Sequence, residues 1–359
     1  MTDARPDRDL EAQIADRLRQ AHADRHAVYI NGGGSKRHFL GRDCDAATLE
    51  VGGHSGIVDY QPRELVVTAR AGTTISALQA ALAQEGQHLS FEPPQFAGLA
   101  TLGGTLASNL SGPGRPWWGS ARDMVLGARI ISGTGEPLNF GGQVMKNVAG
   151  YDVSRLQAGA LGSLGVLSSI SLKVLPLPEA STTLVYECDA ATALQMMHER
   201  AASPKPLTGA CWVAGRLYLR LSGAASAVAH TASLWGGERP EQGPFWADLR
   251  DMRLPFFATE APLWRLSLRS SAPPQAVADE DLLIDWGGAQ RWIRGEHSLA
   301  SLHEQAAGAG GHVQLVRGGD RSAELRGPLQ GAQQHLQQQL KSRFDPGGIL
   351  NPGRMYTWL

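Results

Sequence analysis

Residues 28–36 of the chain read VYINGGGSK, a short apolar run followed by three consecutive glycines. The apolar run predicts a β-strand that ends where the glycines begin. Successive glycines can turn their N–H groups to one side and so form a nest for an anion. A P-loop needs Gly-Lys-Ser/Thr, but Ser35 precedes Lys36 here, and a dinucleotide fingerprint would need glycine at Arg37. Residues 32–36 are therefore a candidate phosphate-binding loop, with a flexible turn as the alternative.

Two further clusters of small residues follow along the chain. Residues 100–112 read ATLGGTLASNLSG, and residues 159–166 read GALGSLGV immediately before an apolar run. Small residues let the backbone approach a flat ligand closely and present amide and hydroxyl donors to phosphates and ring carbonyls. A glycine-cushioned helix start would explain the first of these clusters without a ligand. Three such clusters in one region favour a shared ligand site.

Helical and strand periodicities surround these clusters. Residues 10–18 predict an amphipathic helix, and residues 74–83 predict another, capped by Thr73 or Thr74 and ending near Gly86. We expect strands at 65–68, 125–131 and 164–174, and a long irregular stretch at 93–119. Further helices are expected at 190–201, 224–234, 298–307 and 329–343, and further strands at 217–221, 263–268 and 313–316. This alternation predicts a second, α+β domain.

Six sequence motifs together resemble a known fold. They are NGGGSK at 31–36, the loop at 94–112, RDMVLGARIISGTGE at 122–136, KNVAGYDVSRL at 146–156, GALGSLGV at 159–166 and FDPGGILNPGRM at 344–355. The combination resembles the PCMH-type FAD-binding fold of the vanillyl-alcohol-oxidase superfamily, and most of all its GlcE-type subunits of bacterial glycolate oxidase. The resemblance covers most of 32–178 and the tail from Phe344, while the middle of the chain is less distinctive.

The resemblance implies a two-lobed α+β architecture. Residues 1–178 would form the PCMH-type FAD-binding domain and residues 179–340 an α+β cap domain that covers the substrate. Residues 341–359 would form a C-terminal tail that packs back on the FAD-binding domain.

The resemblance also implies which residues hold FAD. The pyrophosphate would lie on Gly32, Gly33, Gly34, Ser35 and Lys36. The pyrophosphate and isoalloxazine would be lined by Pro94, Thr101, Leu102, Gly103, Gly104, Ala107, Ser108 and Gly112, and backbone groups would be presented by Gly162, Ser163, Gly165 and Val166. We expect a bulky residue at Gly33 or Gly103 to occupy space that the pyrophosphate needs. Some relatives tether FAD through a histidine in the first glycine loop, and since NGGGSK has none, non-covalent FAD is expected.

The catalytic groups are less evident. Self-sufficient 2-hydroxy-acid dehydrogenases of this family share a GHxGDGNxH signature, whereas the nearest stretch here is GHVQL at 311–315. Oxidation of a hydroxy acid needs a base, cations for the carboxylate and flavin N5 as hydride acceptor. Candidates on the active face are Lys146, Asn147, Tyr151 and the tail residue Asn351. Candidate bases are His297 and His312, and candidate carboxylate clamps are Arg216, Arg220, Arg265 and Arg269. Structural turns and ion pairs are the alternative roles for all of these residues.

Composition narrows the classes of partner. The 359 residues carry a formal net charge of −1 without a dense basic block, so nucleic acid is not expected. No apolar stretch is long enough to span a bilayer, and the charged N-terminus predicts a cytoplasmic protein, or one peripheral to the inner membrane through its complex. The three cysteines are far apart and the eleven histidines dispersed, so neither an iron–sulfur nor a metal site is expected.

The resemblance implies partners that supply what this chain lacks. These are a larger FAD-containing subunit with the full catalytic signature and an iron–sulfur subunit that receives the electrons. Two alternatives remain at this stage. The chain could be a self-contained FAD-dependent dehydrogenase of hydroxy acids or alcohols, or a non-catalytic flavin-binding subunit whose nine tryptophans serve partner surfaces.

Overall fold

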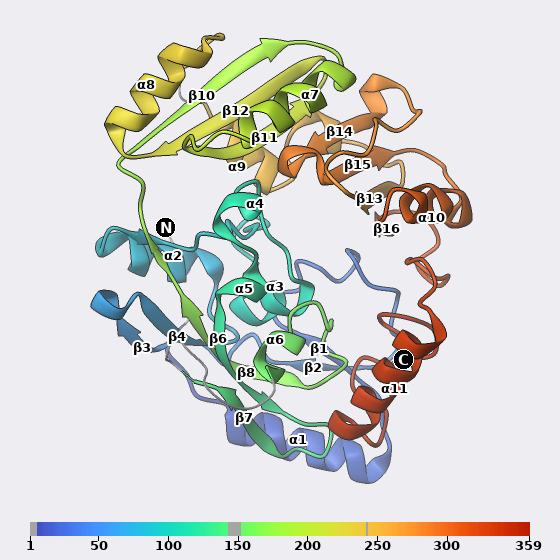
Figure 1. The fold of residues 1–359 in the computed structure, drawn as a ribbon. Coiled ribbons are helices and arrows are strands. Elements are labelled where there is room, and N and C mark those ends of the chain that lie inside the picture. Colours follow the sequence, from blue (N-terminus) through green and yellow to red (C-terminus); the bar gives the residue numbers. More distant parts are fainter. Residues whose placement is uncertain (1–5, 143–151, 242) are drawn as a thin grey trace.

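The computed structural model describes residues 6–142, 152–241 and 243–359, which form two lobes (Figure 1). The lower lobe contains a five-stranded sheet in which every neighbouring pair is antiparallel. Its order is β3 (Ile57–Gln61), β4 (Val66–Arg70), β8 (Val166–Lys173), β6 (Val125–Ile131) and β7 (Pro137–Gly141). Two short parallel strands, β1 (Val28–Asn31) and β2 (Ala47–Glu50), lie beside it.

Amphipathic helices cover the lower sheet. Ile75, Leu78 and Leu82 recur on one face of α2 (Ile75–Gln84) and are fully buried against the sheet. Thr74 caps this helix by accepting a hydrogen bond from the Ala77 amide, as predicted. The other helices of the lobe are α1 (Glu11–Asp24), α3 (Leu102–Ser108), α4 (Arg115–Trp118), α5 (Ala121–Met124) and α6 (Val153–Leu156).

The prediction of an irregular stretch at 93–119 is wrong at residues 102–108 and 115–118, which form α3 and α4. Two glycines and a threonine in α3 are weak helix formers. The Thr101 hydroxyl nevertheless caps the helix by accepting from the Gly104 amide, and Leu102 and Leu106 are buried in the core of the lobe. Tertiary burial therefore overrides local propensity in this segment.

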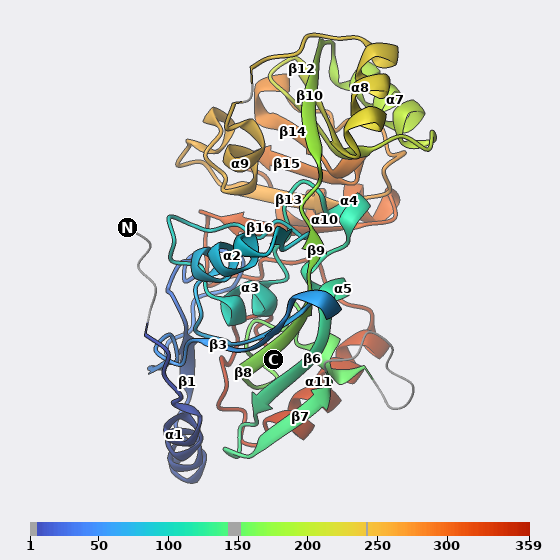
Figure 2. The ribbon, with the colours of Figure 1, turned by 90° about the vertical axis from the view of Figure 1, so that its left-hand side faces the viewer.

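The upper lobe is a seven-stranded antiparallel sheet (Figures 1 and 2). Its order is β10 (Ala180–Glu187), β12 (Arg216–Gly223), β11 (Leu207–Val213), β14 (Leu282–Asp285), β15 (Gln290–Arg294), β13 (Leu263–Ser267) and β16 (His312–Arg317). One face packs on α7 (Ala190–Ala201), α8 (Ala225–Trp235) and α10 (Leu299–Gly308). The other face contacts α9 (Phe245–Arg250) and Phe39, Leu40 and Leu110 of the lower lobe.

The remaining elements are short. The small ladder of β5 (Gln87–His88) and β9 (Leu175–Pro176) lies where the chain leaves the lower lobe. The 3₁₀ turns are η1 (Pro62–Glu64), η2 (Pro255–Phe257), η3 (Asp279–Asp281) and η4 (Trp286–Gly288). An ion pair between Arg220 and Glu92, 2.6 Å long, connects the lobes near this ladder, since both charges act on His88 of β5.

The chain returns to the lower lobe at its end. After α11 (Gly331–Phe344), the Val28 amide of β1 donates to the carbonyl of Ile349 at 2.8 Å. Lys341 pairs with Asp345 at 2.7 Å and donates to the Leu350 carbonyl at 2.7 Å. The mixed helix and sheet architecture confirms the predicted fold class. The domain boundaries after residues 178 and 340 stay a prediction.

Candidate cofactor-binding groove

Two adjoining cavities meet at the C-terminal end of β1 and together form one groove. They span about 520 and 450 Å3 of space, part of which is open solvent. Both are lined by Ile30, Gly32, Thr101, Gly104, Ala107, Leu161 and Asn351. The three glycine-rich clusters of the sequence therefore converge on one groove.

The first wall is the loop that follows β1. At Gly33 any side chain would overlap the carbonyl oxygen of Leu99, so only glycine fits. Gly34 adopts a φ of 71°, in the left-handed region that glycine occupies without strain. We expected Gly33 and Gly103 to leave room for a ligand, but a Cβ on Gly103 would lie 2.7 Å from that of Ala71. Both glycines instead let segments of the protein approach each other.

The second wall is the start of α3. Gly104 differs from its neighbour because an added Cβ would meet only the Thr101 hydroxyl at 3.2 Å and Lys36 Nζ at 3.8 Å. The open side of Gly104 therefore faces the groove and Lys36.

Lys36 provides the positive charge of the groove. Its Nζ lies 3.2 Å from the Ser35 hydroxyl and 5.0 Å from the ring centre of Phe96. Over the described residues it forms no ion pair with a carboxylate. Burial lowers the pKa of Lys36 to about 8. An enclosed ammonium without a counter-ion is suited to a bound anion.

The third wall joins the 161–167 segment to the tail. The Asn351 carboxamide accepts from the Ile30 amide at 2.8 Å and donates to the Leu161 carbonyl at 2.6 Å. A Cβ on Gly162 would lie 2.6 Å from the same amide nitrogen. Asn351 therefore lines the groove, and its side chain holds β1, the tail and the third glycine cluster together.

Most of the predicted cofactor residues line the groove, and some do not. Those along it are Gly32, Gly33, Gly34, Ser35, Lys36, Thr101, Gly103, Gly104, Ala107, Ser108, Gly162, Gly165 and Val166. Pro94 and Leu102 are buried elsewhere. Gly112 packs against the carbonyl of Glu92, and the Ser163 hydroxyl donates to the Ala160 carbonyl at 2.7 Å. The four residues away from the groove have packing roles in this structure.

Other lining residues were not predicted from the sequence. They are Tyr29, Arg37, Phe39, Val51, Ala71, Leu161, Leu167 and Arg354, together with Ile30 and Asn31 of the strand. Arg354 lies in the tail motif, and its guanidinium donates to the carbonyls of Lys36 and Arg37 at 2.9 and 2.6 Å. Arg354 could have been predicted from the motif at 344–355, which contains it. No local sequence pattern identifies the apolar residues as lining residues.

The catalytic candidates do not gather at the groove. Lys146, Asn147 and Tyr151 lie outside the described residues. His297 follows β15, and His312 begins β16 in the upper lobe. Among the arginines, Arg216 pairs with Glu187, Arg220 with Glu92, Arg269 donates to the Ala309 carbonyl, and Arg265 donates to Gln314. None of these histidine and arginine side chains lines the groove, whereas the candidate Asn351 does.

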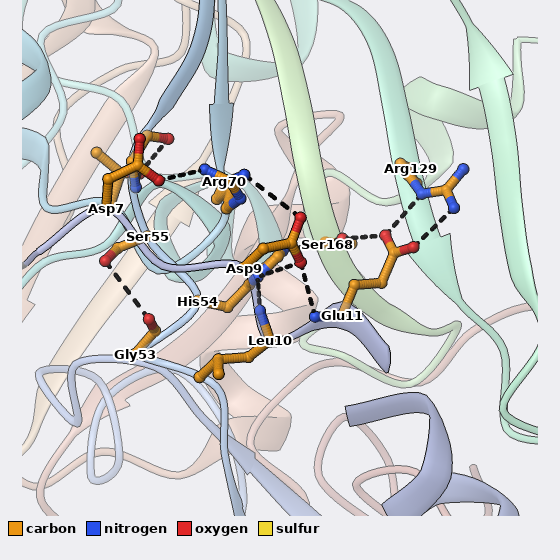
Figure 3. Close-up of polar contacts among 12 residues, drawn as sticks. Asp7, Asp9, Leu10, Glu11, Gly53, His54, Ser55, Arg70, Arg129 and Ser168 are labelled. Carbon is orange, nitrogen blue, oxygen red and sulfur yellow. Dashed lines mark hydrogen bonds and ion pairs between the residues drawn. The ribbon is translucent and has the colours of Figure 1, made fainter. Parts of the chain in front are cut away.

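A His–Ser–Glu cluster outside the groove superficially resembles a hydrolytic triad (Figure 3). Nδ1 of His54 accepts from the Leu10 amide at 2.9 Å, so Nε2 carries the proton that faces the Ser168 hydroxyl at 3.0 Å. The Ser168 hydroxyl donates to Glu11 at 2.6 Å, and Glu11 pairs with Arg129 at 2.6 Å. His54 therefore cannot accept the serine proton. The cluster anchors the start of α1 to the sheet.

Two other kinds of site were searched for in the described part of the chain. No group of three or more His, Cys, Asp or Glu residues there could hold a metal ion. Across residues 6–142, 152–241 and 243–359, no helix is both long enough and apolar enough for a bilayer crossing.

Known proteins match this chain over its whole length. A family model described as an FAD binding domain matches residues 9–141. The glycolate oxidase subunit GlcE of Escherichia coli K12 is 46% identical over 352 residues, which cover 98% of this chain and 99% of that protein. This chain belongs to the GlcE family of glycolate oxidase subunits. This membership confirms the predicted resemblance. It also confirms the prediction that the chain is an FAD-linked oxidoreductase.

More distant relatives agree with the GlcE assignment. The glycolate oxidase subunit GlcD of Bacillus subtilis is 30% identical over 189 residues, which cover 51% of this chain and 40% of GlcD. A solved alkyldihydroxyacetonephosphate synthase superposes with a TM-score of 0.65 at 16% identity, over 94% of this chain and 75% of the synthase. At that identity the structural match supports the fold alone.

Proposed function

We propose that this GlcE-family chain is the FAD-binding subunit of a multi-subunit glycolate oxidase. It takes part in the oxidation of glycolate, a 2-hydroxy acid, to glyoxylate. The observation that carries the proposal is the groove, in which three glycine-rich walls surround the uncompensated ammonium of Lys36. These features fit FAD because its pyrophosphate supplies the missing negative charge.

The groove suggests how FAD is held. The 32–36 loop with Lys36 would bind the pyrophosphate, and the small residues of α3 and of 162–166 would lie along the rest of the cofactor. When bound, FAD supplies the acceptor for the hydride that leaves the hydroxy acid. Among the residues that the structure describes, no histidine or cysteine lines the groove, which supports non-covalent binding.

The chain would depend on partner subunits for the complete reaction. Cys44 and Cys188 are partly buried, Cys211 is fully buried, and burial raises the pKa of all three thiols. No cysteine pair has the spacing of an iron–sulfur site. We therefore propose that electrons pass to an iron–sulfur subunit and that a larger FAD-containing subunit carries the full catalytic signature. The chain would be cytoplasmic, or peripheral to the inner membrane through this complex.

The absorbance spectrum of the purified chain tests the assignment. Flavin bands should be present, and acid precipitation should release the flavin into the supernatant, whereas flavin in the pellet would contradict non-covalent binding. Anaerobic glycolate or D-lactate should bleach the bands only when the partner subunits are added. Bleaching of the isolated chain would make it a self-contained dehydrogenase. Bands that persist even in the complex would make it a non-catalytic assembly subunit.

A further inference from the structure

Two arginines and a glutamine lie in one row at the edge of the upper sheet. In the antiparallel register Arg265 of β13 pairs with Gln314 of β16, and Gln314 pairs in turn with Arg326. Directly paired residues project from the same face of a sheet. Arg265 accordingly donates to the Gln314 side chain at 3.3 Å. His312 lies two residues before Gln314 on the same strand and therefore projects from the same face.

The cations of this row have no counter-ions. Arg265, Arg326 and nearby Arg115 of α4 form no ion pair with any carboxylate that the structure describes, although Asp123 acts on Arg115 from a greater distance. The undescribed residues contain a single acid, Asp3. Nε of Arg326 is buried without a hydrogen-bond partner. An enclosed guanidinium in this state is costly unless an anion joins it.

An open space of about 1060 Å3, part of it bulk solvent, borders the row at Gln314 and Arg326, whereas Arg265 and Arg115 do not line it. Its polar lining is His303, His312, Gln314, Arg326, Gln330, Gln333 and Tyr356. Burial, with Arg265, Arg326 and Arg115 nearby, lowers the pKa of His312, so its imidazole is neutral at neutral pH. The open space thus offers the guanidinium of Arg326, amide groups and the neutral imidazole of His312, a set suited to a small hydroxylated acid.

The open space adjoins the candidate flavin groove through two chain segments. The Gln314 amide donates to the Leu40 carbonyl at 2.5 Å, and the preceding residue, Phe39, lines the groove. In the tail, Arg354 lines the groove and Tyr356 lines the open space. The row and the groove are therefore bordered by neighbouring residues of the same two segments, 39–40 and 354–356.

We propose that Arg326, which lines the open space, binds the carboxylate of a small 2-hydroxy or 2-oxo acid, with Arg265 of the same row and Arg115 adding positive charge. The proposal rests on the proposed function and selects Arg265 among the four arginines predicted from the sequence. Arg216 and Arg220 are committed to ion pairs with glutamates, and Arg269 to a backbone carbonyl. Arg115 and Arg326 carried no sequence signal of their own.

Calorimetric titration of the purified, flavin-loaded chain tests the site. Oxalate is the main probe because it has the size of glycolate and cannot be oxidised by hydride loss, and glycolate and inorganic phosphate are titrated in parallel. Arg265→Met and Arg326→Met should each weaken oxalate and glycolate binding roughly 10- to 100-fold, the range for a lost hydrogen bond to a charged group. The matched control Arg269→Met should leave both affinities unchanged.

Several outcomes would overturn the site. Absence of oxalate binding, unchanged affinity in both variants, or tighter binding of phosphate than of either carboxylate would each do so. Melting temperature and flavin content show whether a variant folds, and Arg265→Lys replaces a variant that does not, with an intermediate loss expected. If oxalate binds but glycolate fails to bleach the flavin even after the partner subunits are added, the site stands and the proposed function is refuted.

Discussion

Replacing Gly104 by alanine separates the stability of the fold from the affinity for FAD. Gly104 lies inside α3, where alanine is favoured over glycine by about 1 kcal/mol. Its added methyl would meet only the Thr101 hydroxyl at 3.2 Å and Lys36 Nζ at 3.8 Å. The flavin-free variant should therefore be as stable as the unchanged chain or more so.

The same methyl should weaken FAD binding because it projects into the groove beside Lys36. Overpacking by one methyl costs about 1–3 kcal/mol, or roughly a 5- to 150-fold rise in Kd. Titration of the flavin-free chain with FAD, followed by flavin fluorescence, gives the affinity, and thermal melting gives the stability.

Gly308→Ala is the matched control. Gly308 is also helical, and an added Cβ there would meet nothing within 4 Å. This variant should keep the affinity of the unchanged chain. A stable Gly104→Ala chain that binds FAD with unchanged Kd would refute the placement of the cofactor in the groove.

Three further predictions concern charged groups. Lys36→Met should weaken FAD binding and abolish a fall in affinity as the pH rises past about 8, where the ammonium loses its proton; equilibrium dialysis that finds the same pH profile in both chains would contradict it. Burial lowers the pKa of His54, so its contribution to stability is complete above the ordinary value of 6.5 and is lost as the pH falls below it. The melting temperature of His54→Gln should thus fall less on acidification, and an equal fall would exclude this role. Arg220→Met leaves Glu92 unpaired between the lobes and should cost about 3 kcal/mol of unfolding free energy in urea. Adding Glu92→Gln should recover part of the loss, and a purely additive double variant would argue against coupling.

The groove was largely predictable because it is built from backbone. Close approach of segments demands glycine, as at Gly33 beside Leu99, and such demands leave clusters that are visible in the sequence. At Gly112, which lies away from the groove, an added Cβ would meet the Glu92 carbonyl, so glycine there allows a close contact within the protein. A glycine in the sequence indicates a close contact with its backbone but does not indicate whether the contact is with protein or with a ligand.

The upper lobe could be predicted only element by element. The helix at 190–201 has the bounds of α7, and the strand at 263–268 is one residue longer than β13, since their patterns are local. The row of Arg265, Gln314 and Arg326 depends on strand register across distant parts of the chain. No local pattern distinguishes Arg265 from the paired arginines, so its lack of a counter-ion emerges only from the fold.

Pairing between the two ends of the chain also determines when the groove can form during synthesis. The amide of Ile30 and the side chain of Asn351 are 321 residues apart in sequence. Because a ribosome releases the N-terminal end first, the glycine loops emerge long before the segment that closes them. A nascent chain therefore cannot complete its cofactor site until the segment that contains Asn351 has emerged, and a chain that stops before that segment would carry every glycine loop without a closed wall.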